Sequence, residues 1–486
     1  MNAVVDRLGI ETRLHVNDVH SKLNDTEVSE RVYARGESDV VAAIERARDR
    51  GLPLAVCGGR HAMGGQQFAT NGMLLDMSRL DRVLDFDPGT GLIEIESGIE
   101  WPKLLREYLA AQEGVKDQWG IRQKQTGADR LSVGGALAAN IHGRVLANKP
   151  IIEDIVSFRI IDAEGRLLKC SREENADLFR LVIGGYGLFG VIVSVTMQLV
   201  PRQKMQRIVE LRTLDELCDA FADRIMAGYR YGDLQFVIDE KCDDFLNKGI
   251  FSCYRPVPND TPIPDDQTYM TEQGWYDLLH LAHIDKSRAF DSFSSFYLST
   301  SEQIYWSDTH QFTTYLDDYH SRLDKRLCGA HAGSEMITEL YVPAHKLTGF
   351  MEDAKKTLRS TGADLIYGTI RLIRQDEESF LAWARQDFVC VIFNLHVEHT
   401  DAGLARSRNA FLGLIDDALR SDGSFFLTYH RYASREQVSA AYPQFEEFLK
   451  EKQRRDPQAL FASDWYRHYA GLFEDPQCGY RDDRNL

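Results

Sequence analysis

The chain has 486 residues, with 57 Lys and Arg against 74 Asp and Glu, so its formal net charge is −17. This length exceeds what one hydrophobic core usually supports, and two domains are therefore expected. The negative charge and the absence of a Lys/Arg-rich block argue against nucleic acid and against an anionic membrane surface as partners.

Eight cysteines are spread along the chain without a CxxC pair. This spacing favours reduced thiols in a cytoplasmic protein over a disulfide framework or a zinc site. The N-terminus carries Asp6 and Arg7 and no apolar stretch before a cleavage site, so no secretory signal is expected. The uncharged run 181–200 has the length of a membrane span, but the four glycines in its first half favour a buried loop leading into a strand. We therefore expect no membrane insertion.

The first predicted elements lead into a glycine-rich turn. Ser38 is a candidate N-cap for a helix that Gly51 ends, and residues 52–57 are typical of a short strand. This strand delivers the chain into Gly58-Gly59-Arg60-His61. Because glycine has no Cβ and tolerates positive φ, such a turn lets backbone N–H groups approach a phosphate.

A second glycine turn follows further along the chain. Pro102 stands in the first turn of a helix predicted from Trp101, and Gly134-Gly135 then leads to His142-Gly143. Two turns of this kind suggest that the ligand is a diphosphate. The strands predicted in this first half are 74–77, 83–86, 92–95, 155–161, 167–170 and 191–200, with a hairpin between the fourth and the fifth.

The composition changes after about residue 204, where aromatic residues become denser and glycine turns cease. Long strands are predicted at 335–342, 365–373 and 388–397, interleaved with helices at 345–359 and 405–420. This alternation predicts a second domain in which helices cover one side of a sheet.

Three ordered segments carry a family resemblance. Gly58-Gly59-Arg60-His61-Ala62-Met63, followed by Asn71-Gly72 and Leu74-Leu75-Asp76-Met77, resembles the first FAD-binding segment of the vanillyl-alcohol-oxidase/PCMH flavoprotein superfamily. The segment from Ser132-Val133-Gly134-Gly135 to His142-Gly143 resembles the second, and residues 184–192 resemble the third. Three matches in order are far more specific than a single glycine pair. Near the C-terminus, several residues between 442 and 465 resemble the closing motif of the aldonolactone and alditol oxidase branch.

The resemblance implies an α+β fold with a two-part PCMH-type FAD-binding domain and an α+β substrate cap, in which helices cover an antiparallel sheet. Residues 1–203 are expected to form the FAD-binding domain, residues 204–429 the cap, and residues 430–486 the C-terminal return to the FAD-binding domain.

FAD is the implied cofactor. His61 stands where many members carry a histidine joined covalently to the flavin, and the alternative is a neutral histidine packed under the isoalloxazine ring. Members with a second, cysteinyl link carry cysteine where this chain has Ala128, so no such link is expected. The residues expected to contact FAD are Gly58, Gly59, Arg60, His61, Ala62, Met63, Ser132, Gly134, Gly135, Asn140, His142, Gly143, Gly190, Ile192 and Arg431.

Hydride transfer from an alcohol to flavin N5 benefits from a base and from a cation near the developing negative charge. The candidates are His430 or His396 as base, Glu339 as an orienting carboxylate and Arg371 as the cation. Residues 338–343 and 369–371 resemble cap strands of aldonolactone oxidases, but Tyr429 or His430 replaces the lysine that often follows. For Glu339 and Arg371 the alternative is an interstrand ion pair, and for His396 a hydrogen bond on its own strand face.

Two further groups have more than one interpretation. His280 and His283 share a predicted helix face, but no carboxylate or cysteine completes a metal set, so no metal site is predicted. Five residues mix aromatic rings with polar groups, as both ligand pockets and capped aromatic cores do: Tyr305, Trp306, Asp308, His310 and Gln311.

The sequence therefore predicts an FAD-dependent oxidoreductase that oxidises a CH–OH group of a sugar, polyol, lactone or related small molecule. Oxygen or an electron carrier would reoxidise the flavin. Two alternatives stay open: a flavin-dependent reductase or desaturase of a terpenoid or sterol-like side chain, and a flavin-binding protein without turnover.

Overall fold

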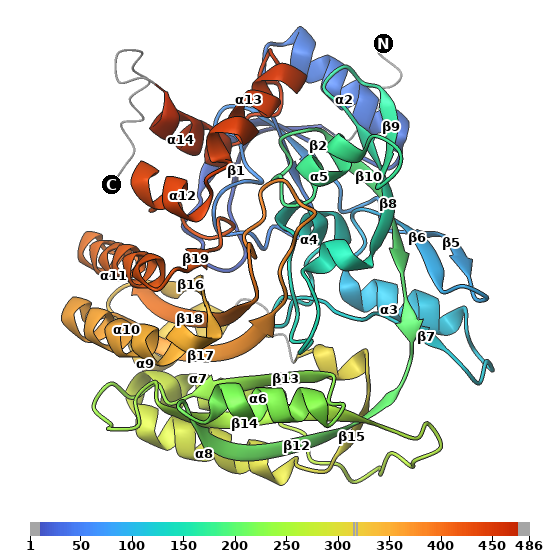
Figure 1. Cartoon of the computed structure of the whole chain (residues 1–486). Helices are drawn as coiled ribbons and strands as arrows, with labels where there is room; N and C mark the ends of the chain where they lie inside the picture. The colour runs from blue at the N-terminus through green and yellow to red at the C-terminus, as the bar shows by residue number, and fades with distance from the viewer. Residues whose placement is uncertain (1–9, 314–315, 317–318, 475–486) are drawn as a thin grey trace.

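The computed structural model describes residues 10–313, 316 and 319–474 (Figure 1). The prediction about a secretory signal concerns residues 1–9 and lies outside the described residues, as does Cys478. Helices and mostly antiparallel sheets share the chain, which confirms the predicted α+β class. The seven described cysteines are free thiols.

Two sheets make up most of the N-terminal part. A four-stranded sheet has the order β1-β2-β4-β3, in which β2, β4 and β3 run parallel. A five-stranded antiparallel sheet has the order β5-β6-β10-β8-β9, and β11 pairs with β7. The strands are β1 Glu11–Val16, β2 Thr26–Tyr33, β3 Leu54–Cys57, β4 Met73–Asp76, β5 Val83–Asp87, β6 Leu92–Glu96, β7 Trp119–Gly120, β8 Ile155–Ile161, β9 Leu167–Ser171, β10 Val191–Gln198 and β11 Val200–Pro201.

The helices of this part are α2 Glu37–Asp49, α3 Trp101–Ala110, α4 Val133–Ala139, η1 Ile151–Asp154 and α5 Ala176–Val182. Gly36 occupies the N-cap position of α2, so the prediction that Ser38 caps this helix is wrong: the helix starts one residue before Ser38. The uncharged run 181–200 contains the end of α5 and the buried strand β10. Within the described residues, no helix is both long and apolar enough to cross a bilayer.

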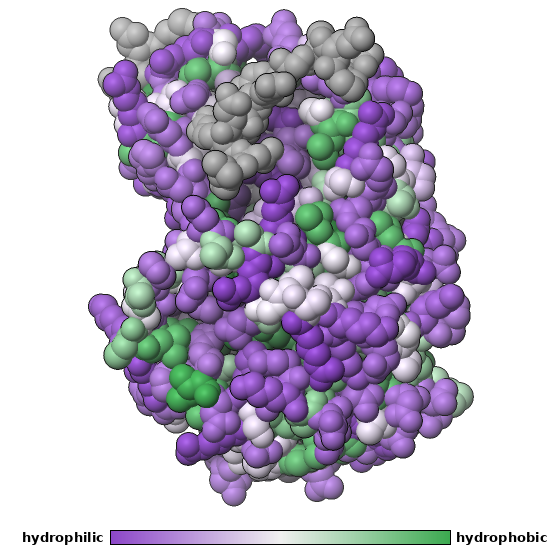
Figure 2. Space-filling view, turned by 90° about the vertical axis from the view of Figure 1, so that its left-hand side faces the viewer, coloured by the Kyte–Doolittle hydropathy of each residue, from purple (hydrophilic) through white to green (hydrophobic). Residues whose placement is uncertain are grey.

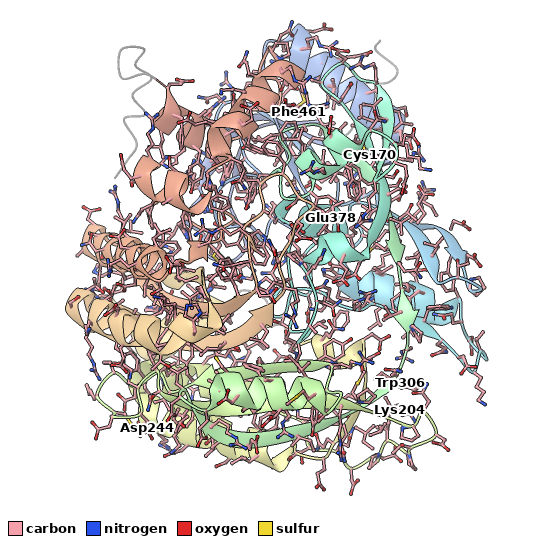
Figure 3. All side chains as sticks on the ribbon, in the orientation of Figure 1. Cys170, Lys204, Asp244, Trp306, Glu378 and Phe461 are labelled. Atoms are coloured by element: carbon pink, nitrogen blue, oxygen red, sulfur yellow. The ribbon has the colours of Figure 1, made fainter. Side chains whose placement is uncertain are left out.

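An eight-stranded antiparallel sheet dominates the second half, in the order β15-β12-β14-β13-β17-β18-β16-β19. At one edge, Lys204 of β12 lies beside Trp306 of β15 (Figure 3). The strands are β12 Lys204–Thr213, β13 Tyr231–Phe236, β14 Lys248–Val257, β15 Ile304–Trp306, β16 Gly333–Val342, β17 Asp364–Ile373, β18 Phe388–Glu398 and β19 Ser424–Phe425. The helices are α6 Leu217–Met226, α7 Glu272–Ile284, α8 Lys286–Ser299, η2 Thr309–Gln311, α9 Tyr319–Leu327, η3 Ala344–Lys346, α10 Leu347–Thr361 and α11 Asp401–Arg420.

Helices cover both faces of this sheet, whereas the sequence predicted helices on one side. Phe350 of α10 packs against Phe393 of β18, and His283 of α7 packs against His396 of the same strand. Residues 393 and 396 point to opposite faces because side chains alternate along a strand. The face that carries residue 396 therefore lies toward α7, and the other face lies toward α10.

The last helices return to the beginning of the chain (Figure 1). They are α12 Arg435–Ala441, α13 Phe445–Arg455 and α14 Asp464–Phe473. The Leu54 N–H donates to the carbonyl of Leu460 at 2.7 Å, and the Trp465 ring stacks on Tyr186 with centroids 4.5 Å apart. The surface in Figure 2 is mostly hydrophilic, in keeping with the net charge of −17. The division into residues 1–203, 204–429 and 430–486 stays a prediction.

Candidate active site

A cavity of about 820 Å³ is lined by residues from both halves of the chain. One wall, which we call the glycine cradle, is formed by residues 58–63 together with Ser132, Gly134, Gly135, Gly190 and Ile192. Another wall, which we call the cap chamber, is formed by one face of the eight-stranded sheet together with α7 and α8. The three segments that resemble FAD-binding segments thus contribute to a single cavity wall.

The first two segments of the glycine cradle touch. A Cβ on Gly58 would lie 2.0 Å from the Ser132 Oγ, so only glycine allows the two turns to approach this closely. Gly190 has a φ of +144°, and a Cβ there would lie 2.6 Å from the carbonyl oxygen of Ile161. Side chains at either position would push the segments apart.

The glycine cradle also offers hydrogen-bond donors. Among the residues that the structure describes, no hydrogen bond uses the N–H group of Gly58 or Gly59. Unpaired backbone N–H groups at a tight turn form the kind of site that binds phosphate oxygens. The geometry of this wall therefore fits the diphosphate of a dinucleotide.

His61 lines the cavity beside these donors. Its Nδ1 lies 2.8 Å from Nε2 of His20. Burial, followed by the neighbouring His20, holds the pKa of His61 well below its usual range, so the ring is neutral near pH 7. A neutral imidazole has the lone pair that a covalent bond to a flavin carbon requires, and its place at the cavity suits either a covalent or a packed histidine. Covalent attachment through His61 stays a proposal.

Most of the predicted cofactor residues line the cavity. They are Gly58, Gly59, Arg60, His61, Ala62, Met63, Ser132, Gly134, Gly135, Gly190 and Ile192. Four do not, namely Asn140, His142, Gly143 and Arg431. Asn140 ends α4 in a left-handed conformation and donates to Asp376 Oδ2 at 2.8 Å, so its side chain is used by the fold.

Glu339 is the centre of a buried hydrogen-bond network at the cavity. Its carboxylate accepts hydrogen bonds from the Tyr341 hydroxyl at 2.9 Å and from the Tyr429 hydroxyl at 2.5 Å, and it lies 3.1 Å from His142 Nε2. Burial by itself would raise the pKa of Glu339, but His142, Tyr429 and Arg371 outweigh it and hold this pKa below its usual range. Glu339 is therefore a carboxylate at neutral pH.

The same network contains a possible set of metal ligands. The ligand atoms of His142, Glu339 and Cys390 lie within 4.8 Å of one another. However, both oxygens of Glu339 already accept hydrogen bonds, and burial raises the pKa of the Cys390 thiol well above its usual range. A metal binds the thiolate and not the thiol. We therefore interpret the set as a hydrogen-bonded network.

Arg371 lines the cavity on β17, two strands away from Glu339 on β16. The described residues offer it no ion pair within 4.0 Å, and its Nε has no hydrogen-bond partner among them. The alternative of an interstrand ion pair with Glu339 is therefore not observed, because β18 separates the two strands. Arg371 presents a buried guanidinium to the cavity instead.

The two histidines predicted as bases lie elsewhere, which is a correction to the expected site. His430 does not line the cavity: its ring stacks on Tyr432 with centroids 5.7 Å apart, and burial lowers its pKa to about 4. The adjacent Tyr429 lines the cavity instead, together with Thr428, in the turn that follows β19. His396 packs against His283 with centroids 4.6 Å apart and also lies outside the cavity lining. Its Nδ1 has no hydrogen-bond partner among the described residues.

In the cluster near residue 308, some residues line the pocket and others belong to the core, so each of the two expected interpretations holds for part of it. Tyr305 and His310 line the cavity, whereas Asp308 is an internal anchor that pairs with Arg202 at 2.8 Å. Arg144 and Arg207 also line the cavity and were missed. Arg144 follows the His142-Gly143 pair directly, and this adjacency was the available signal, but nothing in the sequence marks Arg207.

Comparison with known proteins identifies the cradle side of the cavity. A family model described as "FAD binding domain" matches residues 29–171, which include the two glycine turns that meet at Gly58 and Ser132. Residues 29–171 are an FAD-binding domain. The predicted cofactor and the resemblance to the vanillyl-alcohol-oxidase/PCMH superfamily are thereby confirmed.

Curated relatives match a part of the chain. "Uncharacterized oxidoreductase ORF5 in fasciation locus" of Rhodococcoides fascians is 30% identical over 209 residues, which are 41% of this chain and 45% of that protein. L-gulono-1,4-lactone dehydrogenase of Mycobacterium tuberculosis (strain ATCC 25618 / H37Rv) is 30% identical over 195 residues, 40% and 43% of the two chains. Cytokinin dehydrogenase 9 of Oryza sativa subsp. japonica is 31% identical over 168 residues, 34% and 31%. The chain spans less than half the length of these relatives.

Proposed function

We propose that this chain is an FAD-dependent oxidoreductase that oxidises a CH–OH group of a small molecule to a carbonyl group. One observation carries the proposal: the FAD-binding domain shares its cavity with the Glu339 network and with the unpaired guanidinium of Arg371. FAD, when bound, supplies the acceptor for the hydride that leaves the substrate carbon. The protein must then take the hydroxyl proton and stabilise negative charge.

Tyr429 and Glu339 move the proton in this proposal. Burial and the adjacent Glu339 hold the pKa of Tyr429 well above its usual range, so its hydroxyl is a neutral phenol that donates to Glu339. As the carbonyl forms, the Tyr429 oxygen accepts the substrate proton and passes its own proton to Glu339 Oε1. His142, 3.1 Å from Oε2, stabilises the network. Arg371 offsets negative charge on the substrate oxygen.

The names of the relatives support the substrate class. They include an L-gulono-1,4-lactone dehydrogenase and a D-arabinono-1,4-lactone oxidase, which favours a sugar, polyol or lactone. A second candidate is reduction or desaturation of a terpenoid-like side chain, because α7 and α8 bring apolar residues such as Trp275, Leu278 and Phe293 to the cavity. Oxygen and an electron carrier are both acceptors to be tested. The cytoplasmic location stays a prediction.

Anaerobic mixing of the purified yellow protein with a panel of polyols, lactones and hydroxylated apolar compounds tests the proposal. We expect a member of the panel to bleach the flavin by itself, and Tyr429→Phe to slow this reduction by about 100-fold with little change in FAD content. Tyr269→Phe is the matched control, because Tyr269 also lines the cavity but is 67% exposed and does not contact Glu339.

Two results would contradict the proposal. A flavin that is reduced only by an external donor such as NADPH, and then reduces an apolar alkene, would favour the second candidate. Reduction of Tyr429→Phe by an alcohol at the wild-type rate would remove Tyr429 from the proton path.

A further inference from the structure

Arg144 and Arg207 both line the cavity, and one carboxylate, that of Asp233, pairs with Arg144. Arg144 donates to Asp233 Oδ1 at 3.3 Å. Arg207 donates to the Tyr254 hydroxyl at 2.7 Å and to Thr300 Oγ1 at 2.9 Å, and among the described residues no carboxylate lies within 4.0 Å of it. Asp233 compensates one guanidinium, so this group of residues carries an excess positive charge.

His310 adds a hydrogen-bond donor to the two guanidinium groups. Burial, followed by the charges of Arg144 and Arg207, holds the pKa of His310 well below its usual range, so its ring is neutral. Its Nδ1 lies 3.1 Å from Arg144 Nη2, and because a guanidinium only donates, Nδ1 accepts. The ring proton therefore resides on Nε2. Neither His310 Nε2 nor Arg144 Nε has a hydrogen-bond partner among the described residues.

The neighbouring tyrosines do not neutralise this charge. Burial raises the pKa of Tyr305 to about 12 and also raises the pKa values of Tyr297 and Tyr367, so all three are neutral phenols at pH 7. Their rings enclose the site: the Arg207 guanidinium lies 5.0 Å from the ring centroid of Tyr297 and 5.3 Å from that of Tyr305. Buried donors without acceptors destabilise the protein, and a ligand with acceptor oxygens would satisfy them.

We propose that this group, the arginine subsite, binds an oxyanion of the substrate, a carboxylate or a phosphate, through Arg144, Arg207 and His310. The planar fork of a guanidinium matches both oxyanions, which supports the assignment. The inference rests on the proposed function and narrows its substrate class to anionic molecules.

The other residues of the cap chamber indicate the chemical character of the rest of that substrate. The helices α7 and α8 bring Trp275, Leu278, Phe290 and Phe293 to the cavity, so the body of the molecule is apolar. Asp233 of β13 is three strands from Glu339 of β16, or about 14 Å along the sheet at about 4.8 Å per strand. The oxyanion is therefore remote from the reacting hydroxyl. An amphipathic hydroxy compound with an anionic end fits this arrangement.

Binding of three matched probes to the FAD-loaded protein tests the inference. The probes are 4-phenylbutanoate, 4-phenylbutyl phosphate and the neutral 4-phenylbutan-1-ol, titrated calorimetrically near pH 7. We expect at least one anion to bind at least about tenfold more tightly than the alcohol, which corresponds to one charge-assisted contact. The two anions distinguish a carboxylate from a phosphate subsite.

Substitutions then locate the preference. Arg207→Met should abolish the advantage of the anion over the alcohol, and Arg207→Lys should retain part of it. Arg255→Met is the matched control, since Arg255 is an exposed arginine of β14 that donates to Gln206, and it should bind like the wild type. FAD content reports whether each variant folds. If Arg207→Met does not fold, the affinities of the wild-type protein for the three probes still test the inference.

Equal binding of all three probes to the wild type, or no binding of either anion, would overturn the inference. So would an anion preference that survives in a folded Arg207→Met protein. These measurements need no turnover, so they separate the two proposals: anion preference without any flavin reduction contradicts the function alone, and reduction by alcohols without anion preference contradicts the subsite alone.

Discussion

The glycine cradle and the cap chamber form walls of the same cavity, yet the chain specifies them in different ways. The cradle uses short runs of consecutive residues that approach one another closely, as where the backbone of Gly58 meets the side chain of Ser132. The cap chamber uses alternate residues of strands that are far apart in the sequence, such as Arg207, Asp233 and Arg371. The residues of the cradle can therefore be recognised as a sequence motif, whereas the set of residues that lines the cap chamber depends on strand register.

The largest effect is expected from a substitution in the glycine cradle that prevents FAD binding. Gly58→Ala should abolish most FAD binding, because the new Cβ would lie 2.0 Å from Ser132 Oγ and force the two turns apart. The measurement is flavin absorbance relative to protein absorbance after purification, with reconstitution by added FAD.

Gly349→Ala is the matched control for that substitution. Gly349 is an exposed residue of α10 with nothing within 4 Å of an added Cβ. It should leave FAD content unchanged and stabilise the protein by roughly 0.5–1 kcal/mol. A Gly58→Ala protein with a full complement of FAD would show that close approach of the turns is not what holds the cofactor.

A smaller effect is expected at the chemical end of the cap chamber. Arg371→Met should slow flavin reduction by substrate by about 10- to 100-fold at unchanged FAD content, because the buried guanidinium no longer offsets negative charge on the substrate. Stopped-flow reduction measures it. Arg374→Met is the control, since Arg374 is exposed and pairs with Asp387. Equal rates for the two variants would assign Arg371 to the fold and not to the reaction.

The smallest effect concerns His430, a buried residue outside the cavity lining. The pKa of His430 is lowered from 6.5 to about 4, so between these pH values the unfolded chain binds a proton that the folded protein does not. Stability should therefore fall as the pH drops from about 6.5 toward 4, with His430 contributing at most about 1.4 kcal/mol per pH unit.

His430→Phe should make this acid destabilisation shallower without changing the pH profile of flavin reduction. Thermal unfolding at neutral and mildly acidic pH measures the first effect, and His345→Phe, at an exposed histidine, should leave the slope as it is. A changed pH profile of flavin reduction would instead support a role for His430 in the reaction.

Most residues of the glycine cradle were predicted from the sequence. The glycine turns predicted a diphosphate ligand, the family resemblance of three ordered segments implied FAD, and eleven of the fifteen residues expected to contact it line the cavity. One exception, Asn140, ends α4 and donates a hydrogen bond to the distant Asp376, so its side chain is used by the fold. On the chamber side Glu339 and Arg371 were found, but the base was assigned to His430 and His396, which both lie outside the cavity lining.

Two kinds of information explain this division. Composition, periodicity and the glycine turns by themselves indicated a mixed α+β pattern, most strands and a diphosphate ligand, because each depends on residues close together in the chain. The FAD-binding domain followed from the family resemblance of three ordered segments. Only the tertiary structure decided which side of a segment faces the cavity, as for Tyr429 against His430, and which distant strands bring Arg207, Asp233 and Arg144 together. Tyr429 and His430 lie in a turn without regular periodicity, and strand pairing depends on residues far apart in the chain, so no local pattern reports either choice.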